Sequence, residues 1–529
     1  MFRRIVKAWQ FRRHCKSKQN SAQTGEELKP AETPASNQLC KNIEYIQNAL
    51  GNSGDVKIHT FSFGENNSLQ GALVFIDGLV DLKLISQSIL MPLLAYRFSE
   101  NGGRPENLEE LSRAVLCSGD VTSYAGIDAL ISGCLSGDTM LLADGLSGGL
   151  VISSRGYDKR GVTEPQSETV VRGPREGFTE NFRTNTSLLR RRIKSPDLRL
   201  DHMKIGRKSK TDVCVAYIEG VADPKIVDTV KNRLKAIVID SVVDSGYLEQ
   251  YIEDSPYSIF PTVGYSEKPD VVAGRVLEGH VAVISDGSPF VLTAPMLFIE
   301  SFQTSEDYYI RTIYASIVRL LRFLAFTITV FGPALYIALT TFHQELIPTT
   351  LLYTFADARE GTPFPAFFEA LVLVLAFELL REAGVRLPRP IGQAISIVGA
   401  LIMGDAAVSA GIVGAPMVIT VAVTAVSGFV VPRQSDAASI LRLIAMIFAS
   451  ILGGYGIAMV YLFILLHLAR LQSFGIPYFE TVKPNRDLQD SYIRLPLWKM
   501  LKRPLHISRG DVTRREGISP TDNKPGGRK

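Results

Sequence analysis

The sequence predicts an α+β membrane protein, in which a soluble N-terminal α/β region of two subdomains precedes an α-helical transmembrane block of four to five segments. Two observations of the 529-residue chain support this prediction. Residues 323–468 contain no lysine, six arginines and eight acidic residues, and their apolar runs are long enough to cross a bilayer. The residues before them mix strand-like apolar runs with helical stretches. A wholly soluble protein is therefore excluded.

We expect five regions along the chain, separated where the composition changes. The boundary between the two soluble subdomains is placed near the charged, Gly- and Pro-containing stretch 155–177. In chain order the regions are a basic disordered tail and linker (1–38), α/β subdomain 1 (39–165), α/β subdomain 2 (166–318), a helical transmembrane domain (319–470) and a basic C-terminal tail (471–529).

The soluble region repeats one pattern three times, an apolar run that ends in Asp-Gly. The runs are Leu73–Gly78, Met140–Gly145 and Val281–Gly287. Asp-Gly after a strand favours a tight turn, because Gly adopts positive φ at little cost. Carboxylates gathered around a metal are the alternative, and no copy shows the clustered ligands that a metal needs. Strands are expected at residues 72–76, 139–143, 213–218, 281–285 and 290–293, and a helix at 224–239.

The motifs of common enzymes are missing or misplaced. Gly145–Gly149 matches G-x-S-x-G, but a second strand-like run follows Ser147 where a nucleophile elbow requires a helix. We predict a Gly-rich hairpin there. The sequence holds no Walker A motif and no H-E-x-x-H, and its seven histidines have no ligand spacing. We therefore expect no enzyme, no cofactor and no metal.

Charge and cysteine content indicate the chain's surroundings. Residues 1–18 carry seven Lys or Arg and no acidic residue, and residues 471–529 carry twelve against six. Basic ends suit lipid headgroups, and no nucleic-acid-binding fold is recognisable, so we expect membrane lipid and no nucleic acid as a partner. The five cysteines have no C-x-x-C spacing, which favours reduced thiols in a cytoplasmic domain.

The topology of the helical block stays open at this stage. The arginines of residues 381–389 and of residues 433–442 both favour the cytoplasmic side. Five full spans would carry the basic tail outside, whereas four spans plus one re-entrant or interfacial segment would keep both termini inside. The five apolar segments are Phe323–Thr341, Phe364–Leu380, Ile391 to about Val413, Ala415–Val431 and Leu443–Leu468.

Two acidic residues within these segments are candidates for an ion path, since an ionisable residue in a membrane indicates function by default. Glu369 interrupts the second segment and has no obvious local partner, so we expect it to reach water unless another helix neutralises it. Asp405 interrupts the third segment and could instead cap a helix break. Glu378 shares a helix face with Arg381 and Glu382, and a local ion pair is the favoured interpretation.

Small and hydroxylated residues form two further rows. Thr420, Thr424 and Ser427 are spaced to share a helix face and are pore-lining candidates, although such hydroxyls often bond their own helix carbonyls. Gly392, Ser396 and Gly399 form a stripe that lets helices approach closely. We expect the chain to self-associate through this stripe.

Several longer motifs resemble one known family. They are Arg359–Ala366 (REGTPFPA), Glu378–Gln393 (ELLREAGVRLPRPIGQ), Ser396–Gly404 (SIVGALIMG), Arg172–Arg183 (RGPREGFTENFR), Arg190–Ile193 (RRRI), Leu277–Phe290 (LEGHVAVISDGSPF) and His343–Pro348 (HQELIP). Over roughly residues 40–480 the chain resembles the GerA-family A subunit of spore germinant receptors. That family often has Gln where Asp405 stands here, which puts any role carried over to this position in doubt.

The resemblance implies a multi-pass receptor subunit in the spore inner membrane that responds to small nutrient germinants. Its implied partners are a transporter-like B subunit and a lipoprotein C subunit, and its implied activity is ion conduction by an oligomer. A sister family, encoded with the dipicolinic-acid release genes, shares the membrane core and would be a non-conducting scaffold. A secondary transporter is the other alternative, but the chain lacks the expected ten or so spans and internal repeats.

Overall fold

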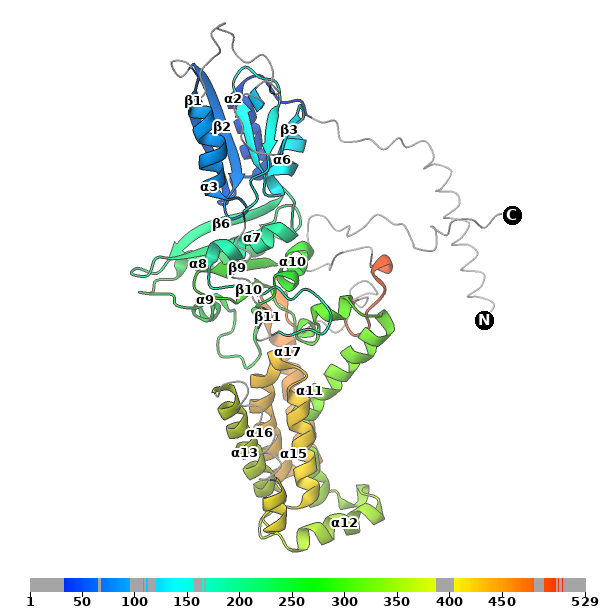
Figure 1. Cartoon of the computed structure of the whole chain (residues 1–529). Coiled ribbons are helices and arrows are strands. Elements are labelled where there is room, and N and C mark those ends of the chain that lie inside the picture. The colour runs from blue at the N-terminus through cyan, green and yellow to red at the C-terminus, as the bar shows by residue number, and fades with distance from the viewer. Residues whose placement is uncertain are drawn as a thin grey trace, which may run out of the picture. The chain divides into compact units, whose positions relative to one another are not determined.

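The computed structural model describes residues 33–64, 68–95, 120–156, 168–386, 404–479 and 490–500, together with residues 108, 111–112, 164–165, 503 and 507 (Figure 1). The chain divides into two compact units between Tyr157 and Asp158, and Lys194–Pro196 belong to the first unit. The first unit holds one α/β subdomain, and the second holds another α/β subdomain together with the helical part.

The first unit is built on a five-stranded antiparallel sheet with the order β1-β2-β4-β5-β3. Alternate residues of β2 point to opposite faces, so that Val74 packs with the helices of one face and Leu73 with those of the other. Its strands are β1 (Val56–Phe63), β2 (Leu69–Ile76), β3 (Val121–Tyr124), β4 (Thr139–Ala143) and β5 (Gly149–Ile152), and its helices are α2 (Leu39–Leu50), α3 (Leu82–Leu84), the π-helix η2 (Ile85–Leu90), α4 (Met91–Ala95) and α6 (Ile127–Leu135).

The second unit begins with a sheet of the same kind, ordered β6-β7-β9-β10-β8 and antiparallel throughout. Helices α7 and α10 contribute to the core on one face, and α8 and α9 to the core on the other. The strands are β6 (Leu198–Ile205), β7 (Thr211–Ile218), β8 (Gly264–Ser266), β9 (Val281–Ser285) and β10 (Val291–Ala294), and the helices are α7 (Phe182–Arg192), α8 (Pro224–Ala236), α9 (Ser245–Ile252) and α10 (Pro269–Glu278).

The two α/β subdomains have the same strand order, and in each a turn carboxylate accepts a hydrogen bond from the first residue of a helix. In the first, the Asp144 carboxylate of the β4–β5 turn accepts a hydrogen bond from the N–H of Leu39, the first residue of α2, at 3.0 Å. In the second, Asp286 of the β9–β10 turn accepts one from Phe182, the first residue of α7, at 3.2 Å. A carboxylate at a helix N-terminus satisfies an otherwise unpaired N–H and complements the helix dipole.

The predicted Asp-Gly turns are confirmed. Gly78, Gly145 and Gly287 have φ of 86°, 85° and 81°, a region that L side chains rarely adopt. Ser147 lies between the paired strands β4 and β5, which confirms the predicted hairpin in place of a nucleophile elbow. Within the described residues no group of three or more His, Cys, Asp or Glu could hold a metal ion.

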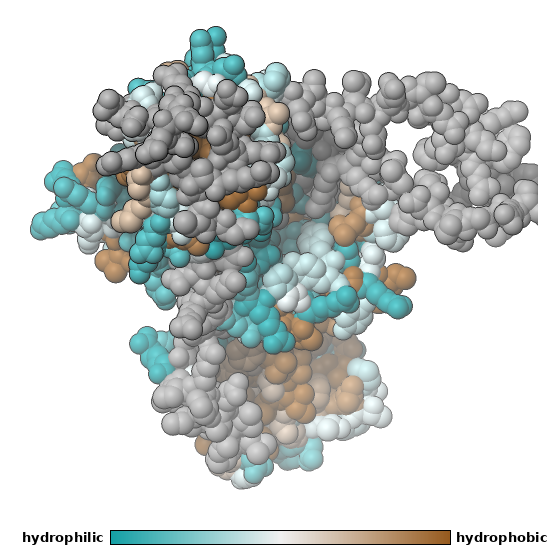
Figure 2. Space-filling model, turned by 45° about the horizontal axis from the view of Figure 1, so that its top comes forward, coloured by the Kyte–Doolittle hydropathy of each residue, from teal (hydrophilic) through white to brown (hydrophobic). Residues whose placement is uncertain are grey.

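The helical part follows two 3₁₀ helices, η3 (Phe298–Phe302) and η4 (Ser305–Tyr308). Two of its helices, Thr312–Thr341 and Pro432–Leu452, are long and apolar enough to cross a membrane among the residues searched. Figure 2 shows hydrophobic residues gathered on the surface of the helical part. Its helices are α11 (Thr312–Thr341), η5 (Gln344–Leu346), α12 (Thr349–Glu360), α13 (Ala366–Arg386), α15 (Ala415–Gly428), η6 (Pro432–Gln434), α16 (Ser435–Leu452) and α17 (Gly454–Arg470).

The expectation of one apolar segment over 443–468 is wrong, because the chain turns back at Gly453. This residue has φ 59°, and it separates α16 from α17. The start of the resulting hairpin pairs with Glu168 through Arg433, and its end hydrogen-bonds to Ser258 through His467. Both ends of the hairpin therefore contact the second α/β subdomain, and its turn lies at the far end beside Phe342.

Residues beyond α17 also lie against the second α/β subdomain. The short strands β11 (Gln472–Ser473) and β12 (Ile476–Pro477) pair with each other, and the Phe298 N–H donates to the Tyr478 carbonyl at 3.0 Å. Residues 471–479 therefore lie at the end of the helical part that contacts the second α/β subdomain. The number of membrane crossings stays a prediction.

Candidate functional site in the helical part

Helix α11 packs against α15 and α16 in the core of the helical part. The approach to α15 is close at Gly332, where a Cβ atom would stand 2.7 Å from Oγ1 of Thr424. Val330 and Ala334 on either side are fully buried. A small residue at position 332 lets the two helix backbones approach as they do at small-residue contacts in membranes.

Glu369, near the start of α13, has partners within its own chain. It is 1% exposed, and its Oε1 lies 3.6 Å from Nε of Arg359 on α12. Oε2 accepts a hydrogen bond from the N–H of Gly414, the residue before α15, at 3.1 Å, and Thr362 Oγ1 donates to Oε1 at 3.4 Å. Of the two outcomes expected for this carboxylate, a partner from another helix is the one found, since the turn after α12 brings Arg359 to it. A place for Glu369 on an ion path stays a prediction.

Glu378 lies farther along α13 and bridges two helices. It pairs with Arg381 at 2.8 Å on its own helix, as the spacing predicts, and with Arg442 of α16. Ser439 Oγ, one turn before Arg442, donates to the same carboxylate at 3.0 Å. Glu382 pairs with Arg386 instead, at 2.6 Å. The pairing of Glu378 thus fixes α13 against α16.

Two of the three hydroxyls in the row on α15 donate to carbonyls of their own helix. Thr420 donates to the Pro416 carbonyl at 2.9 Å, and Thr424 donates to the Thr420 carbonyl at 2.8 Å. Thr424 is buried against α11, whereas Thr420 and Ser427 are half-buried. The bonds from Thr420 and Thr424 to backbone carbonyls are those that such hydroxyls commonly form in membrane helices. Pore lining by these residues stays a prediction.

Asp405 is exposed in the helical stretch 404–409. Gly392, Ser396 and Gly399 lie outside the described residues, so their close packing stays a prediction.

A first junction joins the start of α16 to the second α/β subdomain. Arg433 Nη2 lies 2.7 Å from Glu168 Oε1, and its other terminal nitrogen donates to the Glu300 carbonyl at 3.4 Å. The Glu300 side chain is in turn 3.1 Å from His280 and 3.5 Å from Arg275. Burial would raise the pKa of Glu300, but His280 and Arg275 outweigh it and hold this pKa below its usual value.

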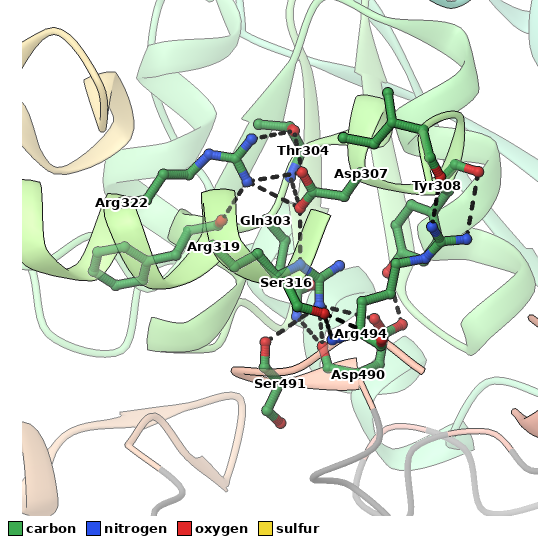
Figure 3. A network of polar contacts seen from close by, with 12 residues as sticks. Gln303, Thr304, Asp307, Tyr308, Ser316, Arg319, Arg322, Asp490, Ser491 and Arg494 are labelled. Atoms are coloured by element: carbon green, nitrogen blue, oxygen red, sulfur yellow. Dashed lines mark hydrogen bonds and ion pairs between the residues drawn. The ribbon is translucent and has the colours of Figure 1, made fainter. Parts of the chain in front are cut away.

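A second junction joins η4 to the start of α11, and Figure 3 shows its polar contacts. Asp307 is fully buried and accepts a hydrogen bond from Arg319 Nε at 2.8 Å and one from Arg322 Nη1 at 2.9 Å. Arg319 is also fully buried, and its Nη1 lies 2.9 Å from Asp490 of the C-terminal segment. Removing one partner of such a buried pair leaves a charge without compensation, so the loss of either residue is expected to destabilise this junction.

Sequence reasoning missed both junctions and the cation beside Glu369. Arg433 was interpreted only through the positive-inside rule, and Arg319 and Arg322 precede the first apolar run. The pairs join positions 265 and 171 residues apart, which no local spacing rule can connect. The motif Arg359–Ala366 was the available signal for the Arg359–Glu369 pair, because its Gly and Pro residues predict the turn that brings α12 back to α13.

These features define the chain as one in which an α/β subdomain is joined by buried ion pairs to an apolar helical part. The chain belongs to the GerA family, described as Bacillus/Clostridium GerA spore germination protein, which matches residues 44–506.

Named relatives agree with this family. Spore germination protein KA of Bacillus subtilis (strain 168) is 44% identical over 480 residues, covering 90% of this chain and 88% of that protein. The uncharacterized membrane protein YfkQ of the same strain is 43% identical over 482 residues, covering 90% and 93%. A crystal structure of the N-terminal domain of the A subunit of the Bacillus megaterium spore germinant receptor GerK3 is 39% identical and covers 51% of this chain and 98% of that chain, with a TM-score of 0.41.

Proposed function

We propose that this chain is the A subunit of a spore germinant receptor, a multi-pass protein of the spore inner membrane that triggers germination in response to small nutrients. Membership in the GerA family supports the germination role. The two helices long enough to cross a bilayer, together with the shorter apolar helices α15 and α17, support the membrane location. A transporter-like B subunit and a lipoprotein C subunit are its proposed partners.

We further propose that several copies assemble into an ion-conducting channel. Each copy contributes polar groups on apolar helices, among them the half-buried hydroxyls of Thr420 and Ser427. Large apolar side chains on α13 and α17 remain exposed within a single copy, including Val372 and Phe463. Such faces require lipid or another helix around them.

The observation that carries the proposal is the pair of junctions between the second α/β subdomain and the helical part. Arg433 ties the start of the last hairpin to Glu168, and Asp307 ties the base of α11 through Arg319 and Arg322. A movement of the α/β subdomain would therefore displace both α11 and α16 at their N-terminal ends. Gating requires a connection of this kind, in which one element biases another.

The test is ion flux through the full chain reconstituted in liposomes, alone and with its B and C subunits. Cation flux that responds to germinant supports the proposal, and Arg433→Gln is expected to weaken the response while leaving the protein inserted. Saturable solute exchange without conductance would identify a transporter instead. No flux of either kind in the presence of all subunits would leave a non-conducting scaffold.

A further inference from the structure

Helix α11 is longer than a bilayer requires. Its 30 residues span about 45 Å at 1.5 Å per residue, against about 30 Å for the hydrocarbon core. The last charged residue of the helix is Arg322, and the 19 residues that follow, 323–341, span about 28 Å and match the core. The first eleven residues, 312–322, therefore project beyond the hydrocarbon on the side of the α/β subdomain.

This projecting part of α11 has two different faces. Ser316, Arg319 and Arg322 face protein: Arg319 is fully buried, and Ser316 hydrogen-bonds to residue 494. The other face is apolar and exposed, and Ile313 retains 79% of its accessible surface. The exposed residues are spaced at one and two helical turns; they are Ile313, Tyr314, Ile317, Leu320 and Leu321.

The C-terminal segment 490–500 lies along the protein-facing side of this helix. Asp490 accepts from Arg319 and from the Tyr308 hydroxyl, the latter at 2.7 Å, and Arg494 Nη1 donates to the Ile310 carbonyl at 3.0 Å. The Tyr492 ring lies 4.8 Å from that of Phe323. These contacts fix the segment at the depth where the apolar run of α11 begins.

The same segment exposes side chains that are typical of a membrane surface. Ile493, Leu497 and Trp498 are exposed, and the exposed Lys499 follows them directly. Tryptophan concentrates at membrane–water interfaces because its ring is apolar and its N–H is polar, and lysine beside it attracts anionic headgroups. Together these side chains expose apolar area to water, and burial at a membrane surface would remove it.

We propose that Leu320 and Leu321, the exposed apolar residues of the projecting part nearest the hydrocarbon, and the side chains of Ile493, Leu497, Trp498 and Lys499 form one interfacial surface, which lies in the headgroup–acyl boundary of the membrane and prefers anionic lipid. Lipid is favoured over a second copy of the chain because the surface is continuous with the helix that enters the hydrocarbon, and because it combines apolar side chains with a cation. The proposal rests on the membrane insertion of α11 and does not depend on ion conduction.

The chain offers a direct test, because it contains only two tryptophans, Trp9 and Trp498. The variant Trp9→Phe leaves Trp498 as the single tryptophan of the full-length protein. It is reconstituted in vesicles of phosphatidylcholine alone and in vesicles that also contain phosphatidylglycerol. In separate preparations, the acyl chains of part of the lipid carry bromine at different depths. Bromine quenches tryptophan on contact, so the depth profile locates the ring. Flotation with the vesicles establishes insertion before fluorescence is measured.

We expect Trp498 emission to be blue-shifted and quenched most by lipids brominated near the headgroup end of the chain. Lys499→Gln should reduce the additional quenching seen with phosphatidylglycerol without altering that seen in phosphatidylcholine. Asp490→Ala removes the carboxylate that fixes the segment on Arg319 and should broaden the depth profile. The matched control is the double variant Trp9→Phe, Trp498→Phe, which contains no tryptophan and reports the background emission.

Unquenched emission from inserted protein would overturn the proposal. If that emission is at long wavelength, Trp498 faces water, and if it is blue-shifted, another protein surface covers it. Ion flux measured on the same vesicles keeps the two proposals distinguishable, because quenching with no flux contradicts only the channel and flux with no quenching contradicts only the interfacial surface.

Discussion

Nη2 of Arg433 lies 2.7 Å from Oε1 of Glu168, although 265 positions separate the two residues in the sequence. The side chains are 14% and 21% exposed, so the pair is mostly shielded from water. It joins the first turn of the last helical hairpin to the α/β subdomain. The positive-inside rule explains Arg433 by its position relative to the membrane, and the structure shows that Arg433 also pairs with an acidic residue of the α/β subdomain.

Removing one member of this pair should destabilise the protein. Arg433→Gln leaves the partly buried Glu168 carboxylate without its charged donor, at a cost of about 1–3 kcal/mol. The measurement is the unfolding midpoint of the purified full chain in detergent. Lys208→Gln is the control, because Lys208 and Asp240 are 80% and 64% exposed, and such a pair contributes roughly 0–1 kcal/mol. Equal losses in both variants would contradict the junction.

Glu369 should tolerate an amide better than an apolar side chain. Glu369→Gln loses the charge that faces Arg359 but keeps an oxygen for the Gly414 N–H, whereas Glu369→Leu loses both and leaves that N–H without its partner. We expect the Leu variant to be less stable by about 1–3 kcal/mol. Ion flux is measured on the same proteins. Wild-type flux from the Gln variant would remove Glu369 from the ion path and leave its structural role.

The stability of the second α/β subdomain should depend on pH through Glu249. Burial, together with the charges of Glu253 and Asp244, raises the pKa of this residue from 4.5 to about 7. Between these two values the folded protein retains a proton that the unfolded chain releases, so the contribution of Glu249 to stability falls as pH rises through this interval.

Glu249→Gln should consequently raise the unfolding midpoint at pH 8 and leave it nearly unchanged at pH 4.5. The exposed Glu44 provides the control, since Glu44→Gln also removes one carboxylate from a helix. A Glu249→Gln variant that gains equally at both pH values would show that the pKa is not raised in the folded state.

The close approach of α11 and α15 should make position 332 sensitive to a single methyl group. Gly332→Ala places a Cβ against Thr424 Oγ1, and the helices must separate. Overpacking of this kind costs about 1–3 kcal/mol. Thr424→Ala removes the obstructing hydroxyl and should restore stability to the double variant. Gly361→Ala is the control, because its Cβ would meet nothing within 4 Å. A loss that persists in the double variant would place the obstruction elsewhere.

The strands and their turns were predictable because their signals are local. The predicted strands 139–143 and 281–285 coincide with β4 and β9, whose residues are all buried. A strand buried on both faces shows an unbroken apolar run, and Asp-Gly marks where it turns. The helix expected at 224–239 ends three residues earlier, at Ala236.

The helical part was less predictable because its signals depend on distant residues. The apolar run over 443–468 continues across the turn at Gly453, so hydropathy cannot locate the break, although the dipeptide Gly453-Gly454 is a recognised breaker. Glu369 has no obvious local partner in the sequence, because Arg359 reaches it only after α12 has folded back. Composition identifies an apolar helix, but the pairing of its rare charges depends on tertiary structure.

The hydrogen bonds that Asp144 and Asp286 accept from helix N-termini occur in both α/β subdomains, which have different neighbours in the chain. The helical part belongs to the same compact unit as the second subdomain, while the first subdomain forms a unit without it. Both nevertheless have the same strand order and the same carboxylate-to-helix bond. The same sheet and the same bond between a turn and a helix therefore form both in a unit without the helical part and in a unit that contains it, although residues after the helical part, Phe474 and Ile476, complete one core of the second subdomain.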